Sequence, residues 1–167
     1  VHVLLLNPDG TVRAEQRISS THGGLTGPLF DNDQFGGSIA GIGDLDGDGI
    51  PDLVIGSQLD DDGGTNRGAV YVLFMNADGT VRAEQKISST RGGLTGPLVN
   101  NVQFGRSVAG VGDLDGDGIP DIAVGTPFDD GGGSNRGAVY VLNLARDGTV
   151  RGERKISSTR GGLIGPL

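Results

Sequence analysis

The stretch DLDGDGIPD, which runs from Asp44 to Asp52, returns unchanged at residues 113–121. The interval from Asp44 to Asp113 is the repeat length of the chain, since other strings recur at the same interval: DGTV begins at Asp9, Asp78 and Asp147. Self-similarity at a fixed period is the signature of a repeat architecture. We therefore divide the chain into three segments: the trailing part of one repeat (1–29) and two full units, 30–98 and 99–167.

Each unit reads as four short strands. In the first full unit we expect them at 37–43, 52–56, 69–75 and 80–88, because apolar runs or apolar–polar alternation are bounded there by Gly- and Asp-rich turns. No segment of ten or more residues has the 3.6-residue periodicity of a helix. The prediction is an all-β chain of tandem four-stranded antiparallel units, similar to the blades of a β-propeller. Segment 1–29 supplies only the third and fourth strands of its unit.

The repeated Asp-rich loop has the spacing of a metal-binding turn. Asp44, Asp46 and Asp48 stand at positions 1, 3 and 5, and Gly49 permits the bend that brings them together. Asp52 at position 9 and the carbonyl of Ile50 at position 7 add further oxygens. Such a set of hard oxygen ligands favours Ca²⁺. The second copy has the same members, so the predicted ligands are Asp44, Asp46, Asp48, Ile50, Asp52, Asp113, Asp115, Asp117, Ile119 and Asp121.

The alternative is an acidic turn without a metal. Two unit charges about 4 Å apart interact by roughly 1 kcal/mol even in water, so carboxylates packed this closely repel one another unless a cation compensates them. A second acidic cluster, Asp60–Gly64 with its counterpart at 129–132, could complete a metal site, but we expect a solvated glycine loop there. Asp31 and Asp33 are replaced by Asn100 and Val102 in the next unit, which weakens the case for a ligand role.

Taken together, the motifs resemble a known repeat family. A Phe-Gly pair at Phe35 and again at Phe104 precedes each Asp-rich loop, and the apolar strand that follows ends in Gly125-Thr126-Pro127 in the second copy. This combination resembles the FG-GAP repeat of integrin α-subunit propellers and of long bacterial surface proteins. The resemblance implies β-propeller blades whose Asp loops bind Ca²⁺. Propellers of that family close a ring of about seven blades, whereas this chain holds about two and a half.

Composition excludes several other classes. The net charge of −8 leaves no basic face to neutralise phosphates, so nucleic acid is not an expected partner. No apolar run approaches the roughly 20 residues of a membrane-spanning helix, so we expect no membrane insertion. His22 follows Ser19 and Ser20 closely, but the serines recur at 88–89 and 157–158 without a histidine. A catalytic triad would be unique rather than repeated, so we expect no enzyme.

The core of each unit follows from its apolar strand positions. We expect it to contain Phe35, Ile39, Ile42, Leu53, Ile55, Val70, Val72 and Ile87, with their counterparts one repeat length further on.

Two functions remain open. The near identity of the units favours a calcium-stabilised structural module of an array, surface protein or filament. We expect this module outside the cell, because sites with the millimolar affinity of extracellular modules would be empty in the cytosol. Its partners would be adjacent repeats or other copies of the chain, and surface proteins or glycans are further possibilities. We favour an extended assembly over a closed ring. The alternative is an integrin-like propeller for adhesion or ligand binding. Both place the chain outside the cell or on its surface.

Overall fold

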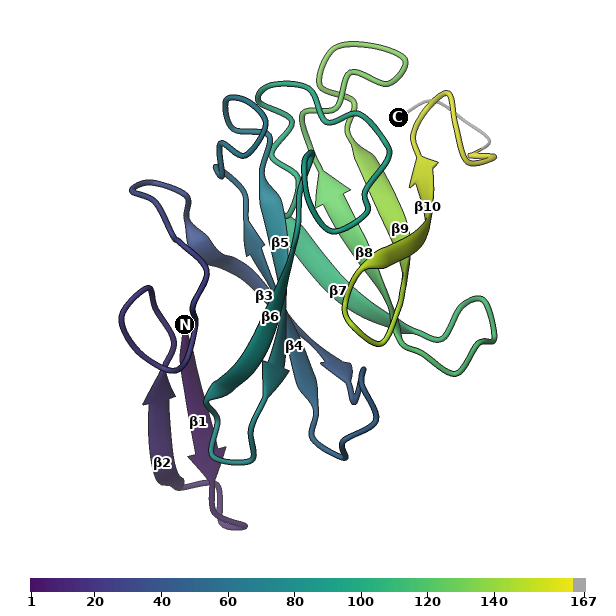
Figure 1. Ribbon diagram of the computed structural model, residues 1–167. Coiled ribbons are helices and arrows are strands. Elements are labelled where there is room, and N and C mark those ends of the chain that lie inside the picture. The colour runs from purple at the N-terminus through teal and green to yellow at the C-terminus, as the bar shows by residue number, and fades with distance from the viewer. Residues whose placement is uncertain (164–167) are drawn as a thin grey trace.

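The computed structural model describes residues 1–163 and contains ten strands and no helix within them (Figure 1). The last four residues of the predicted unit 99–167 lie outside the described residues. The first sheet pairs β1 (His2–Leu6) with β2 (Val12–Arg17). The other two sheets have four strands each: β3 (Phe35–Gly43), β4 (Asp52–Ser57), β5 (Ala69–Met75) and β6 (Val81–Ile87), then β7 (Ser107–Gly112), β8 (Asp121–Thr126), β9 (Ala138–Leu144) and β10 (Val150–Ile156).

Every strand pairs antiparallel with its neighbour in the sequence, in the order β3-β4-β5-β6 and again β7-β8-β9-β10. The predicted all-β, four-stranded antiparallel units are thereby confirmed. Figure 1 shows the sheet β3–β6 in the middle, with the sheet β7–β10 on one side of it and the β1–β2 hairpin on the other.

The meander fixes which loops lie together. In the second sheet the β3–β4 loop and the β5–β6 turn lie at one end, while the β4–β5 loop and the segment after β6 lie at the opposite end. The aspartate loop 44–52 joins β3 to β4, and the acidic loop 60–64 joins β4 to β5. The two acidic clusters of a unit therefore occupy opposite ends of its sheet.

The sheets pack face to face through alternating residues of their third strands. All seven residues of β5 are buried, because neighbouring sheets cover both faces of that strand. Val72 and Phe74 contribute to a core shared with the third sheet, whereas Tyr71, Leu73 and Met75 face the first sheet, with Val1 and Val3 packed against their cluster. A strand buried on both sides needs a continuous apolar run, which the sequence AVYVLFM supplies.

The Phe-Gly pair locks one sheet onto the next. Phe104 is fully buried and lies edge-on to Tyr140, with ring centroids 5.6 Å apart. Gly105 has a positive φ of 87° and its carbonyl lies over Gly56 of β4. A Cβ on Gly56 would lie 2.0 Å from that carbonyl oxygen, so only glycine permits this close approach.

The predicted core is wrong at two positions. Ile39 is 49% exposed and Val139 is 42% exposed. Ile39 pairs with Ile55 and points with Tyr71 toward the first sheet, which has only the two outer strands β1 and β2 and does not reach the innermost strand. Val139 is the counterpart of Val70, but no described sheet follows the third one to cover it. The buried members Ile42, Ile55, Val70, Val72 and Ile87 are confirmed.

Within residues 1–163, no helix has the length and apolar character needed to cross a membrane.

Candidate metal centres and an acidic pocket

The loop between β3 and β4 gathers three carboxylates. Oxygen atoms of Asp44, Asp46 and Asp48 lie within 4.8 Å of one another, and the group is reachable from solvent. The Asp44 carboxylate accepts hydrogen bonds from three loop amides: Gly47 at 2.8 Å, Asp48 at 3.0 Å and Gly49 at 2.9 Å. Gly47 and Gly49 have positive φ values of 87° and 88°, which glycine tolerates at no steric cost. These bonds hold the loop in its bent form, and the amide of Gly49, first among them, lowers the pKa of Asp44.

The aspartate at position 9 is placed differently. Asp52 is completely buried, and its two oxygens accept hydrogen bonds from the amides of Leu45 at 2.9 Å and Met75 at 3.0 Å. It thereby ties the loop to the end of β5. Burial raises the pKa of Asp52, and the nearby charges of Asp46 and Asp48 raise it further. Asp52 is not among the three carboxylates that converge in the loop, so its part as a metal ligand stays a prediction.

An arginine from the far edge of the sheet reaches the same loop. The Nη2 atom of Arg82, at the start of β6, lies 3.0 Å from the Asp48 carboxylate and also contacts the Asp46 carboxylate. Because the β5–β6 turn lies at the same end of the sheet as the aspartate loop, the Arg82 side chain can span the distance. Sequence reasoning missed this residue, although DGTVR recurs with the aspartate loop in both full units.

The second loop repeats the arrangement with one difference. Asp113, Asp115 and Asp117 again lie within 4.8 Å of one another, and Asp121 is fully buried and bound by the amides of Leu114 and Leu144. Arg151 contacts Asp115 at 3.0 Å and also Asp117. Asn143, which replaces Phe74, donates a 2.7 Å hydrogen bond to Asp115 and is the largest cause of the lowered pKa of that carboxyl.

The donor set fits a hard divalent cation. Three convergent carboxylates in a bent, glycine-containing loop supply only oxygen atoms. The acidic clusters are therefore compatible with divalent cation binding. The predicted carbonyl ligands of Ile50 and Ile119 stay predictions, although both side chains pack onto the neighbouring cores and anchor the loop.

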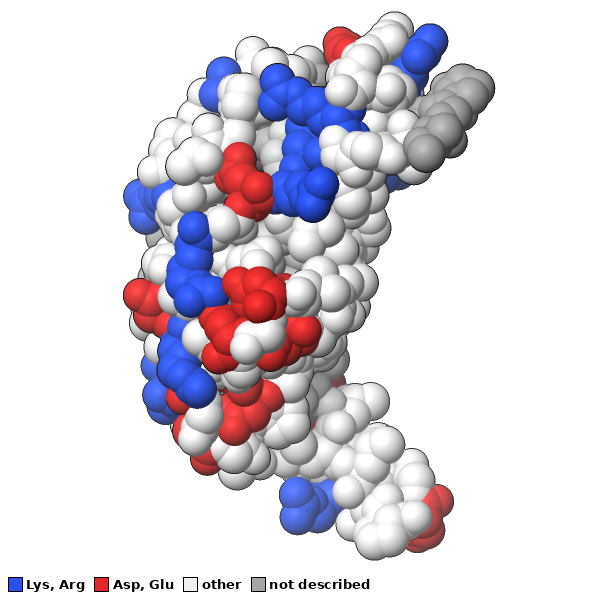
Figure 2. Space-filling model, turned by 90° about the vertical axis from the view of Figure 1, so that its right-hand side faces the viewer, with Lys and Arg blue, Asp and Glu red and all other residues white. Residues whose placement is uncertain are grey.

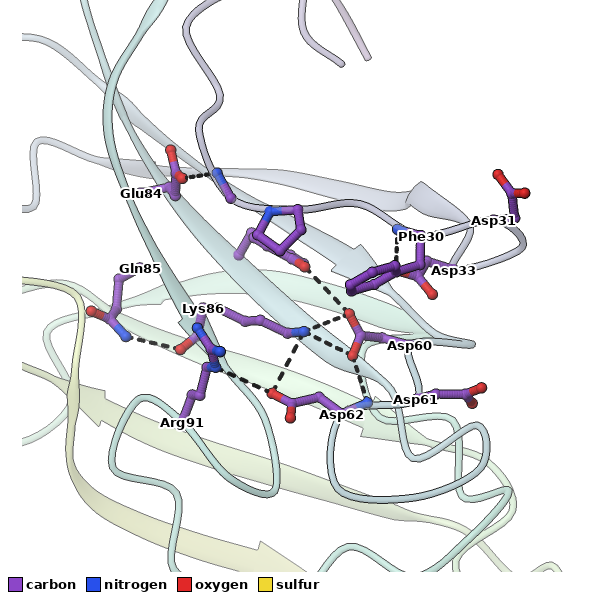
Figure 3. Close-up of a pocket in the computed structure, with 13 residues that line it drawn as sticks. Phe30, Asp31, Asp33, Asp60, Asp61, Asp62, Glu84, Gln85, Lys86 and Arg91 are labelled. Atoms are coloured by element: carbon purple, nitrogen blue, oxygen red, sulfur yellow. Dashed lines mark hydrogen bonds and ion pairs between the residues drawn. The ribbon is translucent and has the colours of Figure 1, made fainter. Parts of the chain in front are cut away.

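A cavity of about 500 Å³ lies at the opposite end of the second sheet (Figure 3). Its wall comes from the segment before β3, the β4–β5 loop and β6, and carries six carboxylates and two cations: Asp31, Asp33, Asp60, Asp61, Asp62, Glu84, Lys86 and Arg91. In Figure 3 Lys86 reaches across the pocket between Asp60 and Asp62. The net charge of this lining is negative.

The expectation of a solvated loop does not hold for Asp60 and Asp129, which are buried, whereas Asp61 and Asp130 of the same loops are exposed. Asp60 is 1% exposed and pairs with Lys86 at 2.8 Å, and Asp129 is 4% exposed and pairs with Lys155 at 2.6 Å. A lysine that recurs in both units, Lys86 and Lys155, explains how these two aspartates can be buried: it neutralises the aspartate and extends over the ring of the neighbouring tyrosine.

The pocket contains residues that the next unit lacks. Asp31, Asp33 and Asp62 correspond to Asn100, Val102 and Gly131, and the equivalent cavity of the third sheet is only about 230 Å³. Asp33 is 5% exposed, and burial raises its pKa. The sequence carried a signal for this pocket, since three aspartates differ between two otherwise near-identical units.

The charges of the two units differ as well. Segment 30–98 holds 11 acidic and 4 basic residues, whereas 99–167 holds 8 and 7. Figure 2 shows acidic patches beside separate groups of Lys and Arg side chains on one face, rather than one continuous basic surface.

The fold and the aspartate loops together define a protein of tandem β-propeller-type blades with one aspartate loop per complete blade. The family model described as FG-GAP repeat matches residues 35–73 and 104–142. The chain is 38% identical to integrin alpha-2 of Mus musculus over 110 residues, which is 65% of this chain and 9% of that protein. It is 40% identical to integrin alpha-5 of Xenopus laevis over 114 residues, 65% of this chain and 10% of that protein.

A longer alignment covers 93% of this chain: it is 31% identical to integrin alpha-3 of Cricetulus griseus over 156 residues, 13% of that protein. The chain therefore carries FG-GAP repeats and is homologous to integrin alpha subunits, as the motifs implied. It spans 9–13% of the length of these relatives.

Proposed function

We propose that the chain is a calcium-stabilised structural module of a larger extracellular or cell-surface protein, and that it has no enzymatic role. The observation that carries the proposal is the aspartate loop, present once in each complete sheet with the same three convergent carboxylates. Calcium would join strands β3 and β4 at the loop and offset the repulsion among the aspartates. The millimolar affinity typical of extracellular modules matches calcium outside cells.

The contacts between consecutive sheets support an array. The amide of Val81 donates a 2.8 Å hydrogen bond to the carbonyl of Gly23, and the amide of Val150 donates one of the same length to Gly92. Each donor and each acceptor stands one repeat length from its counterpart. One and the same contact thus joins each unit to the next, and it can be extended by any number of further units.

Exposed apolar side chains on the outer face of the first sheet also support an array. Leu4 and Leu6 of β1 are 51% and 56% exposed, whereas their counterparts Leu73 and Met75 are 0% and 4% exposed. The partner we propose for this face is another unit, either from the same longer protein or from a second copy.

Calcium titration by calorimetry tests the proposal, with native mass spectrometry in calcium as the second measurement. We expect two binding events per chain with dissociation constants of roughly 10⁻⁴–10⁻³ M. The absence of binding at millimolar calcium would refute the role of the loops. A stable, soluble monomer that keeps its β1–β2 hairpin ordered would refute the proposed need for neighbouring units.

The acidic pocket supports a second candidate function, adhesion or ligand binding. A binding surface needs blades that differ where they touch the ligand, and the pocket gathers three aspartates that the next unit lacks. Its net negative lining suits a basic group such as a guanidinium or amine. Asp60 already has Lys86 as a partner, which leaves Asp31 and Asp61 at the rim of the pocket, where both are reachable from solvent.

Nuclear magnetic resonance titration with arginine amide tests this second candidate. The matched variant Asp31→Asn/Asp33→Val/Asp62→Gly gives the pocket the residues that the next unit carries at the same positions. We expect chemical-shift changes confined to the pocket in the natural chain and none in the variant. Equal shifts in both proteins would exclude the pocket as a binding site.

A further inference from the structure

Each aspartate loop has an arginine placed against its outer oxygens. A single nitrogen of Arg82 contacts both Asp46 and Asp48, and a single nitrogen of Arg151 contacts both Asp115 and Asp117. The arginine belongs to the fourth strand and the loop joins the first strand to the second, so the contact crosses the whole end of the sheet. The contact occurs in both full units, so it is a property of the repeat.

The contact gives the loop a cation of its own. Three carboxylates within 4.8 Å of one another repel, and the positive charge of the guanidinium reduces that repulsion. Arg82 donates a hydrogen bond to Asp46, and an arginine guanidinium is charged at any physiological pH. The guanidinium therefore offsets part of the repulsion among the carboxylates that a metal ion would otherwise have to offset.

The same charge opposes a metal ion. A divalent cation among the three carboxylates would lie near the guanidinium, and two positive charges at such short range repel. The arginine also occupies carboxylate oxygens that would otherwise be free to turn toward the ion.

We propose that Arg82 and Arg151 are resident counter-cations of the aspartate loops: they hold each loop folded in the absence of metal and lower its affinity for calcium. This inference rests on the proposed calcium binding. With these arginines in place, the sites bind calcium only at higher concentrations than the carboxylates alone would require. The blades also stay folded when the calcium concentration is low.

The test compares the whole chain with Arg82→Gln, Arg151→Gln and the double variant. Arg13 provides the matched control, because it holds the same place in segment 1–29. The two aspartate loops within residues 1–163 are contacted by Arg82 and Arg151 instead. In each single variant the unchanged loop is an internal reference. Calorimetry gives the calcium affinity, and thermal melting in chelator gives the stability of the metal-free chain.

We expect each Arg→Gln change to tighten calcium binding at its own loop by about three- to tenfold and to lower the melting temperature in chelator, while Arg13→Gln changes neither. Arg82→Lys keeps the charge and should keep the weaker affinity. Calcium bound with equal affinity by all variants would overturn this inference alone. No calcium binding by any of them would overturn the proposed function and this inference with it.

Discussion

The hydroxyl of Tyr71 donates a 3.3 Å hydrogen bond to Asp60, whereas the hydroxyl of Tyr140, one unit further on, is buried without a partner among the described residues. Both tyrosines are 1% exposed. Asp129, the counterpart of Asp60, is engaged by Lys155 and by the amide of Gly131. Burial raises the pKa of Tyr140 to about 12, so its hydroxyl stays protonated and its proton has no acceptor.

Tyr71→Phe should therefore cost about 0.5–1.5 kcal/mol of unfolding free energy, the usual value of one hydrogen bond. Tyr140→Phe should be neutral or stabilising, because it removes a buried polar atom that has no partner. Urea unfolding of the two variants checks the pair. Equal losses of stability would contradict the difference between the two sites.

Gly56→Ala should cost about 2–3 kcal/mol, because the new methyl group would collide with the backbone carbonyl of Gly105. Gly125 is its counterpart in the third sheet, where the nearest atom to an added Cβ is the Ser107 hydroxyl, a side chain that can rotate away. Gly125→Ala is therefore expected to cost less than about 1 kcal/mol. Chemical denaturation of both variants in the same buffer compares them, and a larger loss for Gly125→Ala would refute the packing argument.

Asp33→Val should stabilise the chain at neutral pH. Burial raises the pKa of Asp33 in the folded state, so protons are bound more tightly there than in the unfolded chain. The contribution of this group to stability is fully present below its unfolded pKa and is lost as the pH rises through the folded pKa. The gain from Asp33→Val should thus be seen at pH 7 and vanish in acid, where the aspartate is neutral in both states. Melting temperatures of the natural chain and of Asp33→Val between pH 3 and pH 7 test this pH dependence.

Asp46→Ala combined with Asp115→Ala should lower the melting temperature in millimolar calcium by about 1–5 °C per site, from a binding contribution of roughly 0.4–1.4 kcal/mol. In chelator the change should be small, because each aspartate removed relieves repulsion while it gives up its contact with an arginine. A loss of equal size in chelator and in calcium would show that these aspartates act without a metal.

Asp52→Ala should behave differently and destabilise the chain by about 2–4 kcal/mol even in chelator, because the amides of Leu45 and Met75 would be left without acceptors. The carboxylate that satisfies them is completely buried, so water cannot replace it at once. Thermal melting of Asp52→Ala beside Asp46→Ala, with and without calcium, separates the two roles. If Asp52→Ala lost stability only in calcium, Asp52 would be a metal ligand with no structural part of its own.

The sequence by itself determined the repeat length, the four antiparallel strands of each unit and the convergence of Asp44, Asp46 and Asp48. Each of these follows from short-range rules: alternation of apolar residues sets the strand, glycine sets the turn, and carboxylates at alternate positions of a bent loop must face one another.

Only the tertiary structure decided which residues are buried between the sheets and which side chains from different strands are in contact. The exposure of Ile39 depends on which strands the neighbouring sheet contains, and the pairing of Lys86 with Asp60 joins residues 26 positions apart. The placement of Arg82 against Asp46 likewise requires the fourth strand and the first loop to meet at one end of the sheet. Side chains from different strands are brought together by pairing and packing, and no local pattern in the chain encodes the distance between them.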